Sequence, residues 1–149
     1  MAEHIKKSHN VSLLLYHLVC PAKYRRVVFE KISGVEEVIK ETCLEIEKRY
    51  ELHFVEVGVD REHVHFLIQS IPAMSPTTIA RTIKSITARK VFQKVTEVKK
   101  MLWGGEFWTK GYYINTVGKS GNEEAIQKYV QEQGLEYKQI YRNQLKLFE

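Results

Sequence analysis

Two histidines separated by one residue, His63 and His65, have the side chains and spacing best suited to chemistry. They lie in a run that alternates like a β-strand, and side chains two apart on a strand leave from the same face. The two imidazoles are therefore predicted to stand side by side, with Val64, Phe66 and Ile68 on the opposite face. Such a pair supplies half of the ligands of a metal site. The alternative is a pair of polar residues on the wetter face of a half-buried strand.

A second pair, Tyr129 and Gln133, lies near the C-terminus in a segment predicted to be a helix over about residues 122–133. Residues four apart on a helix are neighbours, so both side chains can face one site. Asn122 is expected to cap this helix and Gly134 to end it. The same residues also fit an ordinary amphipathic stripe with Tyr129 in the core.

The elements that must position these residues follow from periodicity and from start and stop signals. Strands are expected at residues 11–19, 52–59, 63–69 and 112–117. Helices are expected from a capping box at Ser33–Glu36 to about Tyr50, and from Pro76 onward with Ser75 as cap. This order predicts an α+β domain, ferredoxin-like or RNA-recognition-like (βαββαβ), with an antiparallel sheet, helices on one face and an additional C-terminal helix. The other face would be free for a ligand or partner. The tail, residues 135–149, is predicted either to continue as helix or to lie over a partner.

The bulk composition suits one domain spanning residues 1–149. Hydrophobic residues make up 44% and charged residues 28%, which is ordinary for a globular protein. No apolar run is long enough to span a bilayer, and the N-terminus lacks the apolar core of a signal peptide. Cys20 and Cys43 form no motif and are interpreted as reduced thiols in a cytoplasmic protein. The net charge of +5 is a mild bias toward polyanions such as nucleic acid.

Taken together, these motifs resemble the single-tyrosine HUH transposases of the insertion-sequence-200/605 type. The resemblance extends from the first strand to Gly134. Its motifs are Tyr16-His17-Leu18, Lys23-Tyr24-Arg25, the run from Asp60 to His65, Leu102-Trp103-Gly104-Gly105, and the helix from Ile126 to Gln133. One departure is Glu62, where many relatives carry Asp before the first histidine; this should not affect ligation.

The resemblance implies a role for each residue of the two pairs. His63, His65 and Gln133 would hold a divalent cation, Mg²⁺ or Mn²⁺, and Tyr129 would be the nucleophile. The enzyme would cleave and rejoin single-stranded DNA through a covalent 5′-phosphotyrosine and would recognise subterminal DNA hairpins. The family also implies a homodimer with active sites shared between subunits. Gly118 and Gly121 would then be hinge candidates, although both also suit an ordinary turn before a helix cap.

Basic and aromatic residues offer candidate DNA contacts. The basic candidates are Lys23, Arg25, Arg81, Lys84 and Arg89, because phosphate contacts supply much of the affinity for DNA. More commonly, such residues form a solvated face. Trp103 and Trp108 could stack on an unpaired base, but core packing is the commoner role.

Other functions fit parts of this pattern. A domesticated, repeat-associated single-strand nuclease would use the same residues. A replication or mobilisation initiator shares the chemistry but usually belongs to a longer chain. A non-catalytic nucleic-acid-binding module of the same fold would not need the Tyr129 hydroxyl. A two-histidine RNA phosphoesterase would need a second His-x-Ser/Thr pair, and none follows His65.

Overall fold

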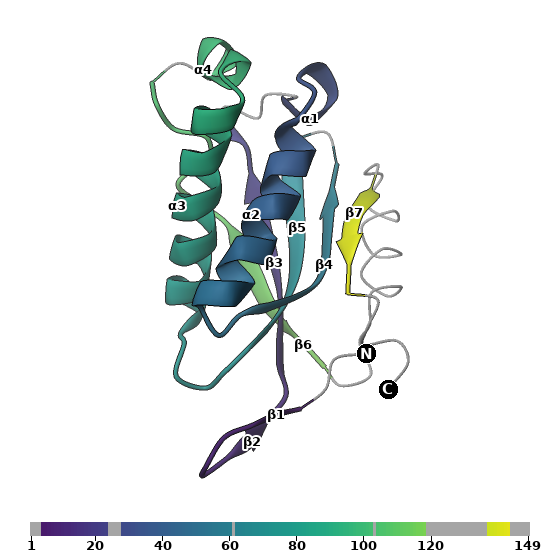
Figure 1. The fold of residues 1–149 in the computed structure, drawn as a ribbon, viewed down its shortest axis with the longest axis vertical. Helices are drawn as coiled ribbons and strands as arrows, with labels where there is room; N and C mark the ends of the chain where they lie inside the picture. Colours follow the sequence, from purple (N-terminus) through teal and green to yellow (C-terminus); the bar gives the residue numbers. More distant parts are fainter. Residues whose placement is uncertain (1–3, 24–27, 61, 103, 119–136, 144–149) are drawn as a thin grey trace.

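Five strands form one antiparallel sheet in the computed structural model, and the helices cover one of its faces (Figure 1). The structure describes residues 4–23, 28–60, 62–102, 104–118 and 137–143. The strand order across the sheet is β6-β3-β5-β4-β7. The strands of this sheet are β3 (Leu14–Pro21), β4 (His53–Val59), β5 (His63–Ser70), β6 (Tyr113–Val117) and β7 (Lys138–Arg142). The helices are α1 (Val28–Lys31), α2 (Val35–Arg49), α3 (Pro76–Lys94) and α4 (Glu97–Met101).

The succession β3-α2-β4-β5-α3-β6 is the predicted βαββαβ order, with β3 and β5 at the centre of the sheet. The ferredoxin-like prediction is therefore confirmed. The predicted helix over 122–133 lies outside the described residues. None of the helices in the described ranges is long and apolar enough to cross a membrane.

The main core lies between the sheet and helices α2 and α3. Helix α2 buries a stripe of apolar side chains at helical spacing, and α3 does the same with its isoleucines. From the sheet, Val64, Phe66 and Ile68 of β5 are completely buried in this layer, as their alternation predicted. Helix α3 also begins as predicted, because the Ser75 side chain accepts a hydrogen bond from the Thr78 backbone amide and Pro76 follows it.

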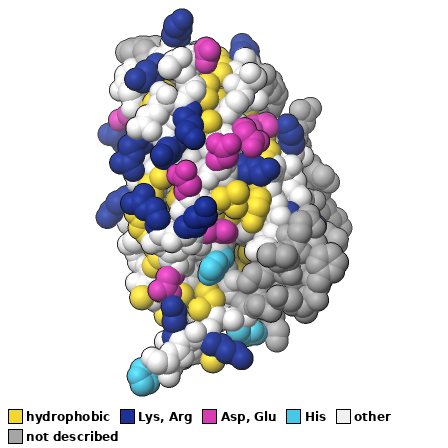
Figure 2. All heavy atoms as spheres, in the orientation of Figure 1, with side chains coloured by type: hydrophobic (Ala, Val, Ile, Leu, Met, Phe, Trp, Pro, Cys, Tyr) yellow, Lys and Arg dark blue, Asp and Glu magenta, His cyan; other side chains and the backbone are white. Residues whose placement is uncertain are grey.

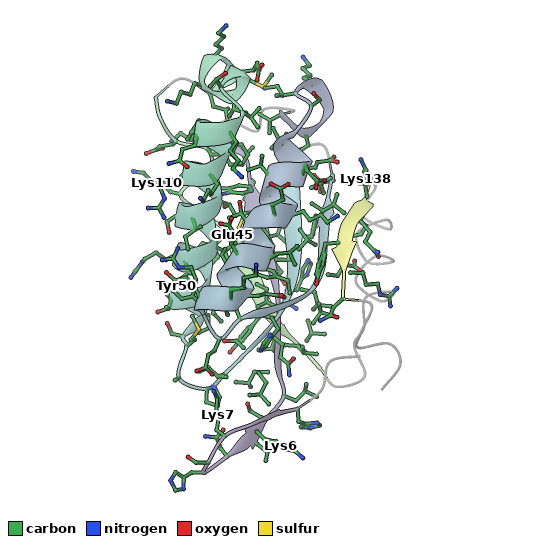
Figure 3. All side chains as sticks on the ribbon, viewed as in Figure 1. Lys6, Lys7, Glu45, Tyr50, Lys110 and Lys138 are labelled. Carbon is green, nitrogen blue, oxygen red and sulfur yellow. The ribbon has the colours of Figure 1, made fainter. Side chains whose placement is uncertain are left out.

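The N-terminal strand is interrupted, which the sequence did not predict. Residues 11–19 were expected to form one strand, but the chain breaks at Leu13 between β2 (Val11–Ser12) and β3. Strand β2 pairs with β1 (Ile5–Lys6) in a small hairpin that projects beyond the main sheet (Figure 1). Lys7 of this hairpin forms an ion pair with Glu51, at the end of α2. Figure 3 labels Lys6 and Lys7 on this projection.

The predicted capping box at the start of α2 is wrong. The N-cap is Gly34, in the left-handed conformation with φ 95°, and no side-chain hydrogen bond caps the helix. The short helix α1 ends at Lys31, so the chain has three residues in which to turn into α2. Only glycine adopts a positive φ without strain, and the backbone turn at Gly34 replaces the Ser33 side chain as the start signal.

The C-terminal tail also differs from prediction. Residues 138–142 were expected to be helical or to cover a partner, but they form β7, which pairs with β4 along an edge of the same sheet. Without β7, the backbone amides and carbonyls on that side of β4 would lack these ladder partners. Lys138, labelled in Figure 3, adds an ion pair of 2.8 Å with Glu36 of α2.

A β-bulge in β4 sets which residues face the helices. The pairing with β5 shifts between Phe54 and Glu56, so Val55 is an extra residue. Phe54 and Val57 therefore both join the core beneath the helices, while Val55 packs with Leu15 and Leu67 on the opposite face. Glu56 and Gly58, opposite Leu67 and His65, are directed to that same face, away from the helices.

The start of α2 gives a direct test of the Gly34 cap. We predict that Gly34→Ala lowers the free energy of unfolding by about 1–2 kcal/mol, because alanine is strained at this φ. Ser33→Ala should change it by less than about 0.5 kcal/mol, since the Ser33 side chain forms no cap. Urea unfolding followed by circular dichroism measures both values. A larger loss for Ser33→Ala than for Gly34→Ala would contradict the assignment.

Candidate active site

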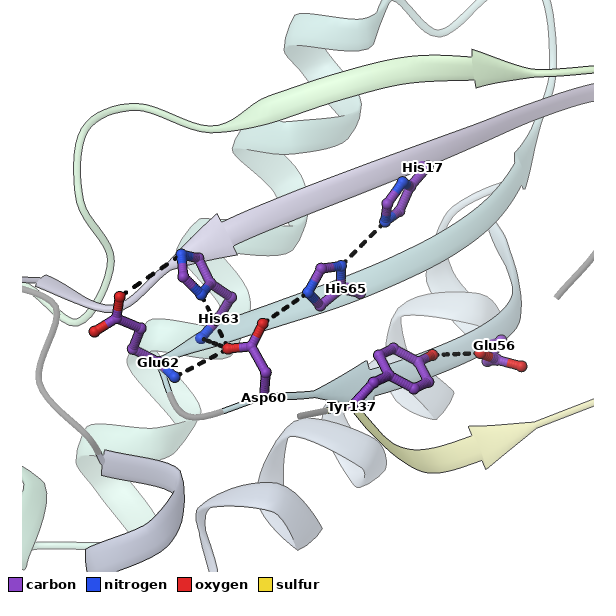
Figure 4. Close-up of polar contacts among 7 residues, drawn as sticks. All are labelled: His17, Glu56, Asp60, Glu62, His63, His65 and Tyr137. Carbon is purple, nitrogen blue, oxygen red and sulfur yellow. Dashed lines mark hydrogen bonds and ion pairs between the residues drawn. The ribbon is translucent and has the colours of Figure 1, made fainter. Parts of the chain in front are cut away.

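The pairing of β3 with β5 gathers three histidines on the sheet face opposite the helices (Figure 4). In this register, Val19 lies opposite His65, and His17 lies opposite Leu67, two residues further along β5. Residues directly opposite each other share a face, so His17, His63 and His65 project to the same side. The predicted same-face placement of His63 and His65 is confirmed, and their ring centroids are 6.4 Å apart.

Asp60 connects the two predicted ligands. It opens the turn between β4 and β5, where its backbone amide donates to the His63 carbonyl at 3.0 Å. One carboxylate oxygen accepts from the Glu62 and His63 backbone amides at 3.1 and 2.8 Å and lies 2.9 Å from His63 Nδ1. The other oxygen lies 3.0 Å from His65 Nε2. A single carboxylate therefore fixes the turn and touches both imidazoles.

The charge of Asp60 follows from these contacts. Burial alone would raise the pKa of this carboxyl group, but hydrogen bonds from His63, His65 and the Glu62 amide outweigh it and hold the pKa well below its usual range. Asp60 is therefore ionised at neutral pH and can only accept hydrogen bonds. The nitrogen of each imidazole that faces Asp60 consequently carries a proton in this arrangement.

His17 completes a continuous chain of polar contacts. Its Nε2 lies 3.1 Å from His65 Nδ1, and the two rings stack with centroids 5.4 Å apart. Burial, followed by the neighbouring His65, lowers the pKa of His17 to about 4, so His17 is neutral at pH 7. Both ring nitrogens of His65 thus have protein partners, Asp60 on one side and His17 on the other.

Tyr137 closes the site from the side of β7. Its ring lies edge-on to His65, with centroids 5.6 Å apart, and its hydroxyl donates to the buried carboxyl of Glu56. The ring occupies the space above Gly58, where any Cβ atom would collide with it. The bulge in β4 is what directs both Glu56 and Gly58 toward this face.

The chemistry of the site is compatible with a divalent cation. His63 and His65 can supply two imidazole nitrogens, and both rings face one carboxylate, which gives a mixed N and O donor set. Within the described ranges, no three His, Cys, Asp or Glu side chains form a ready-made cation cage. The described part of the site is thus an incomplete ligand set that needs at least one further donor.

Comparison with known proteins gives the family. Residues 10–133 match the family model described as "Transposase IS200 like". The chain belongs to the IS200-like transposase family. It is 31% identical to the ISDra2 transposase TnpA of Deinococcus radiodurans over 120 residues, covering 80% of this chain and 84% of that protein. It is 30% identical to the transposase of insertion sequence IS200 from Salmonella typhimurium, covering 79% of this chain and 75% of that protein.

Solved structures agree with this assignment. A crystal structure of a Deinococcus radiodurans R1 protein assigned as a transposase has a TM-score of 0.69 and 28% identity, covering 87% of this chain and 97% of that chain. A tyrosine transposase bound to a REP hairpin has a TM-score of 0.54 and 11% identity, covering 87% and 68%. The second likeness concerns the fold alone. The resemblance to insertion-sequence-200/605 transposases is therefore confirmed.

Several predicted functional residues of this transposase cannot be placed. Tyr129, Gln133, Arg25 and Gly121 lie outside the described residues. Gly118 is described and exposed just after β6, and a Cβ there would meet nothing. The assignment of nucleophile, third ligand and hinge therefore stays a prediction.

Three of the remaining basic candidates, Arg81, Lys84 and Arg89, line an open groove of about 640 Å³ between α3 and residues 105–112. Arg81 and Arg89 are exposed, and Lys110, labelled in Figure 3, lines the groove as well. Lys84 differs, because its ammonium already donates to the carbonyls of Thr109 and Lys110 at 2.7 and 3.1 Å. On the face shown in Figure 2, Lys and Arg gather toward the α3 side with acidic side chains among them.

Lys23 and Trp108, near the same region, both have protein partners. Lys23 forms an ion pair of 2.5 Å with Glu106, so its charge has a protein partner. Trp108 packs in the core and donates to Thr87 at 2.9 Å, as expected for core packing, whereas Trp103 is not described. The DNA-contact roles of Lys23, Arg81, Lys84 and Arg89 stay predictions.

Four residues of the site had no chemical role in the sequence-based interpretation: His17, Glu56, Asp60 and Tyr137. His17 and Asp60 stood inside motifs that carried the family resemblance, but residue spacing alone did not connect them to His65. A signal for Asp60 exists, because aspartate commonly opens a turn by accepting amides two and three residues ahead. Glu56 and Tyr137 are 81 residues apart, and no local pattern links them.

The contact between Gly58 and Tyr137 can be tested by a double-mutant cycle. We predict that Gly58→Ala lowers the free energy of unfolding by about 1–3 kcal/mol, because the added methyl group collides with the Tyr137 ring. In a Tyr137→Ala background the same change should cost much less. Gly111→Ala is the matched control, since a Cβ there meets nothing within 4 Å. Equal costs in both backgrounds, measured by urea unfolding, would refute the contact.

Proposed function

We propose that this chain is a metal-dependent transposase that cleaves and rejoins single-stranded DNA through a covalent bond between Tyr129 and a 5′ phosphate. The observation that carries this proposal is the His63–His65 pair on the sheet face opposite the helices, in a chain of the IS200-like transposase family. Hairpin DNA is the proposed ligand, supported by the structural relative that is a tyrosine transposase bound to a REP hairpin.

The proposed cation ligands are His63, His65 and Gln133, with Mg²⁺ or Mn²⁺ as the metal. When bound, a divalent cation would polarise the scissile phosphate and offset its developing charge. Two imidazoles and an amide are neutral ligands, so they leave the charge of the ion available to DNA. The Asp60 carboxylate contacts the same two rings and maintains their orientation in the metal-free protein.

Chain connectivity supports the placement of Gln133. Tyr137 lies against His65, and Gln133 precedes Tyr137 by four residues. Four extended residues span at most about 14 Å, so the chain length from Tyr137 permits a place for Gln133 beside the histidine face. Tyr129 is eight residues before Tyr137, and the same limit for it is about 28 Å.

The proposed reaction balances without an external energy source. The Tyr129 oxygen bonds to the scissile phosphorus, the bond from phosphorus to the 3′ oxygen breaks, and the phenolic proton ends on the released 3′-OH. The phosphotyrosine bond retains the energy of the broken one, so a 3′-OH can attack it and rejoin the strand. A homodimer with shared sites and a cytoplasmic location stay predictions.

The nucleophile can be identified from the covalent adduct. We predict that single-stranded DNA carrying the element end becomes attached to the wild-type chain, and that Tyr129→Phe abolishes attachment because it removes the attacking oxygen. Denaturing gels with DNA labelled on either side of the cut, followed by peptide mapping, measure this. Tyr137→Phe is the informative control, because the Tyr137 ring already lies beside His65. An adduct that maps to Tyr137 or persists in Tyr129→Phe would overturn the assignment.

The metal role of the histidine pair has its own test. We predict that His63→Ala or His65→Ala abolishes cleavage in Mg²⁺ while binding of hairpin DNA is largely retained, because phosphate contacts elsewhere supply most of the affinity. Cleavage assays and electrophoretic mobility shifts on the same protein samples separate the two effects. Full cleavage by either variant would show that the substituted histidine is not a metal ligand. A non-catalytic binding module would instead show no cleavage by the wild-type chain.

A further inference from the structure

His17 contacts the histidine pair but has no role in the proposed reaction. It lies on β3, one strand away from the histidine pair, and is as deeply buried as His65, at 6% and 4% exposure. Its Nε2 is 3.1 Å from His65 Nδ1, and it is the only partner of that nitrogen among the hydrogen bonds of the described residues. The contact is made by a diagonal pair across the two strands, so the sheet register determines it.

We propose that His17 is a positioning residue for the metal site. It would hold His65 Nδ1, so that Nε2 is the nitrogen that His65 presents to Asp60 and, when bound, to a cation. The proposal rests on the metal role of His65 in the proposed function. It assigns to His17 no contact with the metal or with DNA.

The proton positions explain why a histidine suits this place. In this structure, His65 Nε2 donates to the Asp60 carboxylate, so Nδ1 of a neutral His65 accepts a hydrogen bond from the Nε2–H group of His17. A metal ligand needs a free electron pair on Nε2, which moves the His65 proton to Nδ1. Nδ1 must then donate, and His17 Nε2 must accept. Imidazole can do both because its two nitrogens exchange roles between tautomers.

His17 also limits the motion of the His65 ring. The two rings stack with an interplanar angle of 20°, and the Tyr137 ring packs against His65 edge-on at 72°. His63 has a different environment, with Asp60 at 2.9 Å and the Glu62 carboxyl at 4.0 Å. Among the two predicted ligands, His65 is therefore the one whose orientation is set by packing as well as by hydrogen bonds. A partner that orients a metal-binding histidine typically changes metal affinity 10–100-fold, by the general rule for such contacts.

The test uses the full chain without DNA and Mn²⁺ as the probe. His17→Phe keeps a stacked ring but removes both nitrogens, whereas His17→Gln keeps an amide that can donate or accept near the position of Nε2. We expect His17→Phe to weaken Mn²⁺ binding about 10–100-fold in calorimetry, and His17→Gln to restore most of the affinity. His53→Phe is the matched control, a half-buried histidine of β4 opposite Gln69. Thermal unfolding of each variant checks the fold.

A second measurement needs no variant. Long-range ¹H–¹⁵N NMR spectra of the wild-type chain report which nitrogen of His65 carries the proton. We expect the His65 proton on Nε2 without metal and on Nδ1 with saturating Mg²⁺, which reports ligation through His65 Nε2. The His17 proton should move in step, from Nε2 to Nδ1, because His17 Nε2 must then accept from His65. A purely structural role for His17 would not predict the change in His17.

The outcomes separate this inference from the proposed function. Wild-type affinity in His17→Phe, equal loss in His17→Gln and His17→Phe, or a His17 proton that stays on Nε2 while the His65 proton moves to Nδ1 would each overturn the role of His17 while leaving the metal site intact. Absence of Mn²⁺ binding by the wild-type chain would overturn the metal site and the role of His17 together. If His17→Phe does not fold, the Gln variant and the wild-type spectra decide.

Discussion

Side-chain alternation along β5 is the constraint on which the rest of the structure depends. Val64, Phe66 and Ile68 must enter the core beneath the helices, because their burial provides much of the apolar contact between the sheet and α2 and α3. Since the period of a strand is two, this requirement alone directs His63 and His65 to the opposite face. A shift of one residue would bury both imidazoles under the helices and expose the core. Folding and the site thus depend on the same register.

The geometry of the site also depends on an irregularity, the β-bulge in β4. The bulge at Val55 changes which residues of β4 face the site, and it directs Glu56 and Gly58 toward His65. Glu56 then binds the Tyr137 hydroxyl, and Gly58 leaves room for the Tyr137 ring. The first part of β4 still supplies Phe54 to the core. A bulge lets one strand satisfy both demands within 7 residues.

Features that depend on local periodicity could be predicted from the sequence. These include the two faces of β5, the isoleucine stripe and Ser75 cap of α3, and the βαββαβ order. Features that depend on distant partners could not. The tail gave no strand signal strong enough to predict β7, because an edge strand takes its hydrogen bonds from β4, far away in sequence.

The residues of the site also divide into those that local periodicity predicted and those that depend on distant partners. His63 and His65 are close in sequence and share a face by period, so their placement was predictable. The link from His17 to His65 depends on the pairing of two strands that are 48 residues apart, and sequence spacing does not supply that register. The Ser33 capping box was a reasonable local pattern, but the geometry of the turn from α1 favoured a left-handed Gly34 instead.

The strand order has a topological consequence for any exchange of segments between two copies of the chain. β6 and β7 occupy opposite edges of the sheet, so the stretch between Val117 and Lys138 is anchored at both ends on different borders. Four strand spacings, about 19 Å, separate these borders, and 20 intervening residues can bridge them easily. An exchange of this stretch between two copies would take one of two forms. In the first, the stretch reaches the neighbouring copy while β7 still pairs with β4 of its own chain. In the second, β7 moves with the stretch, and the neighbour's β7 pairs with the β4 edge that was vacated, as in a reciprocal domain swap.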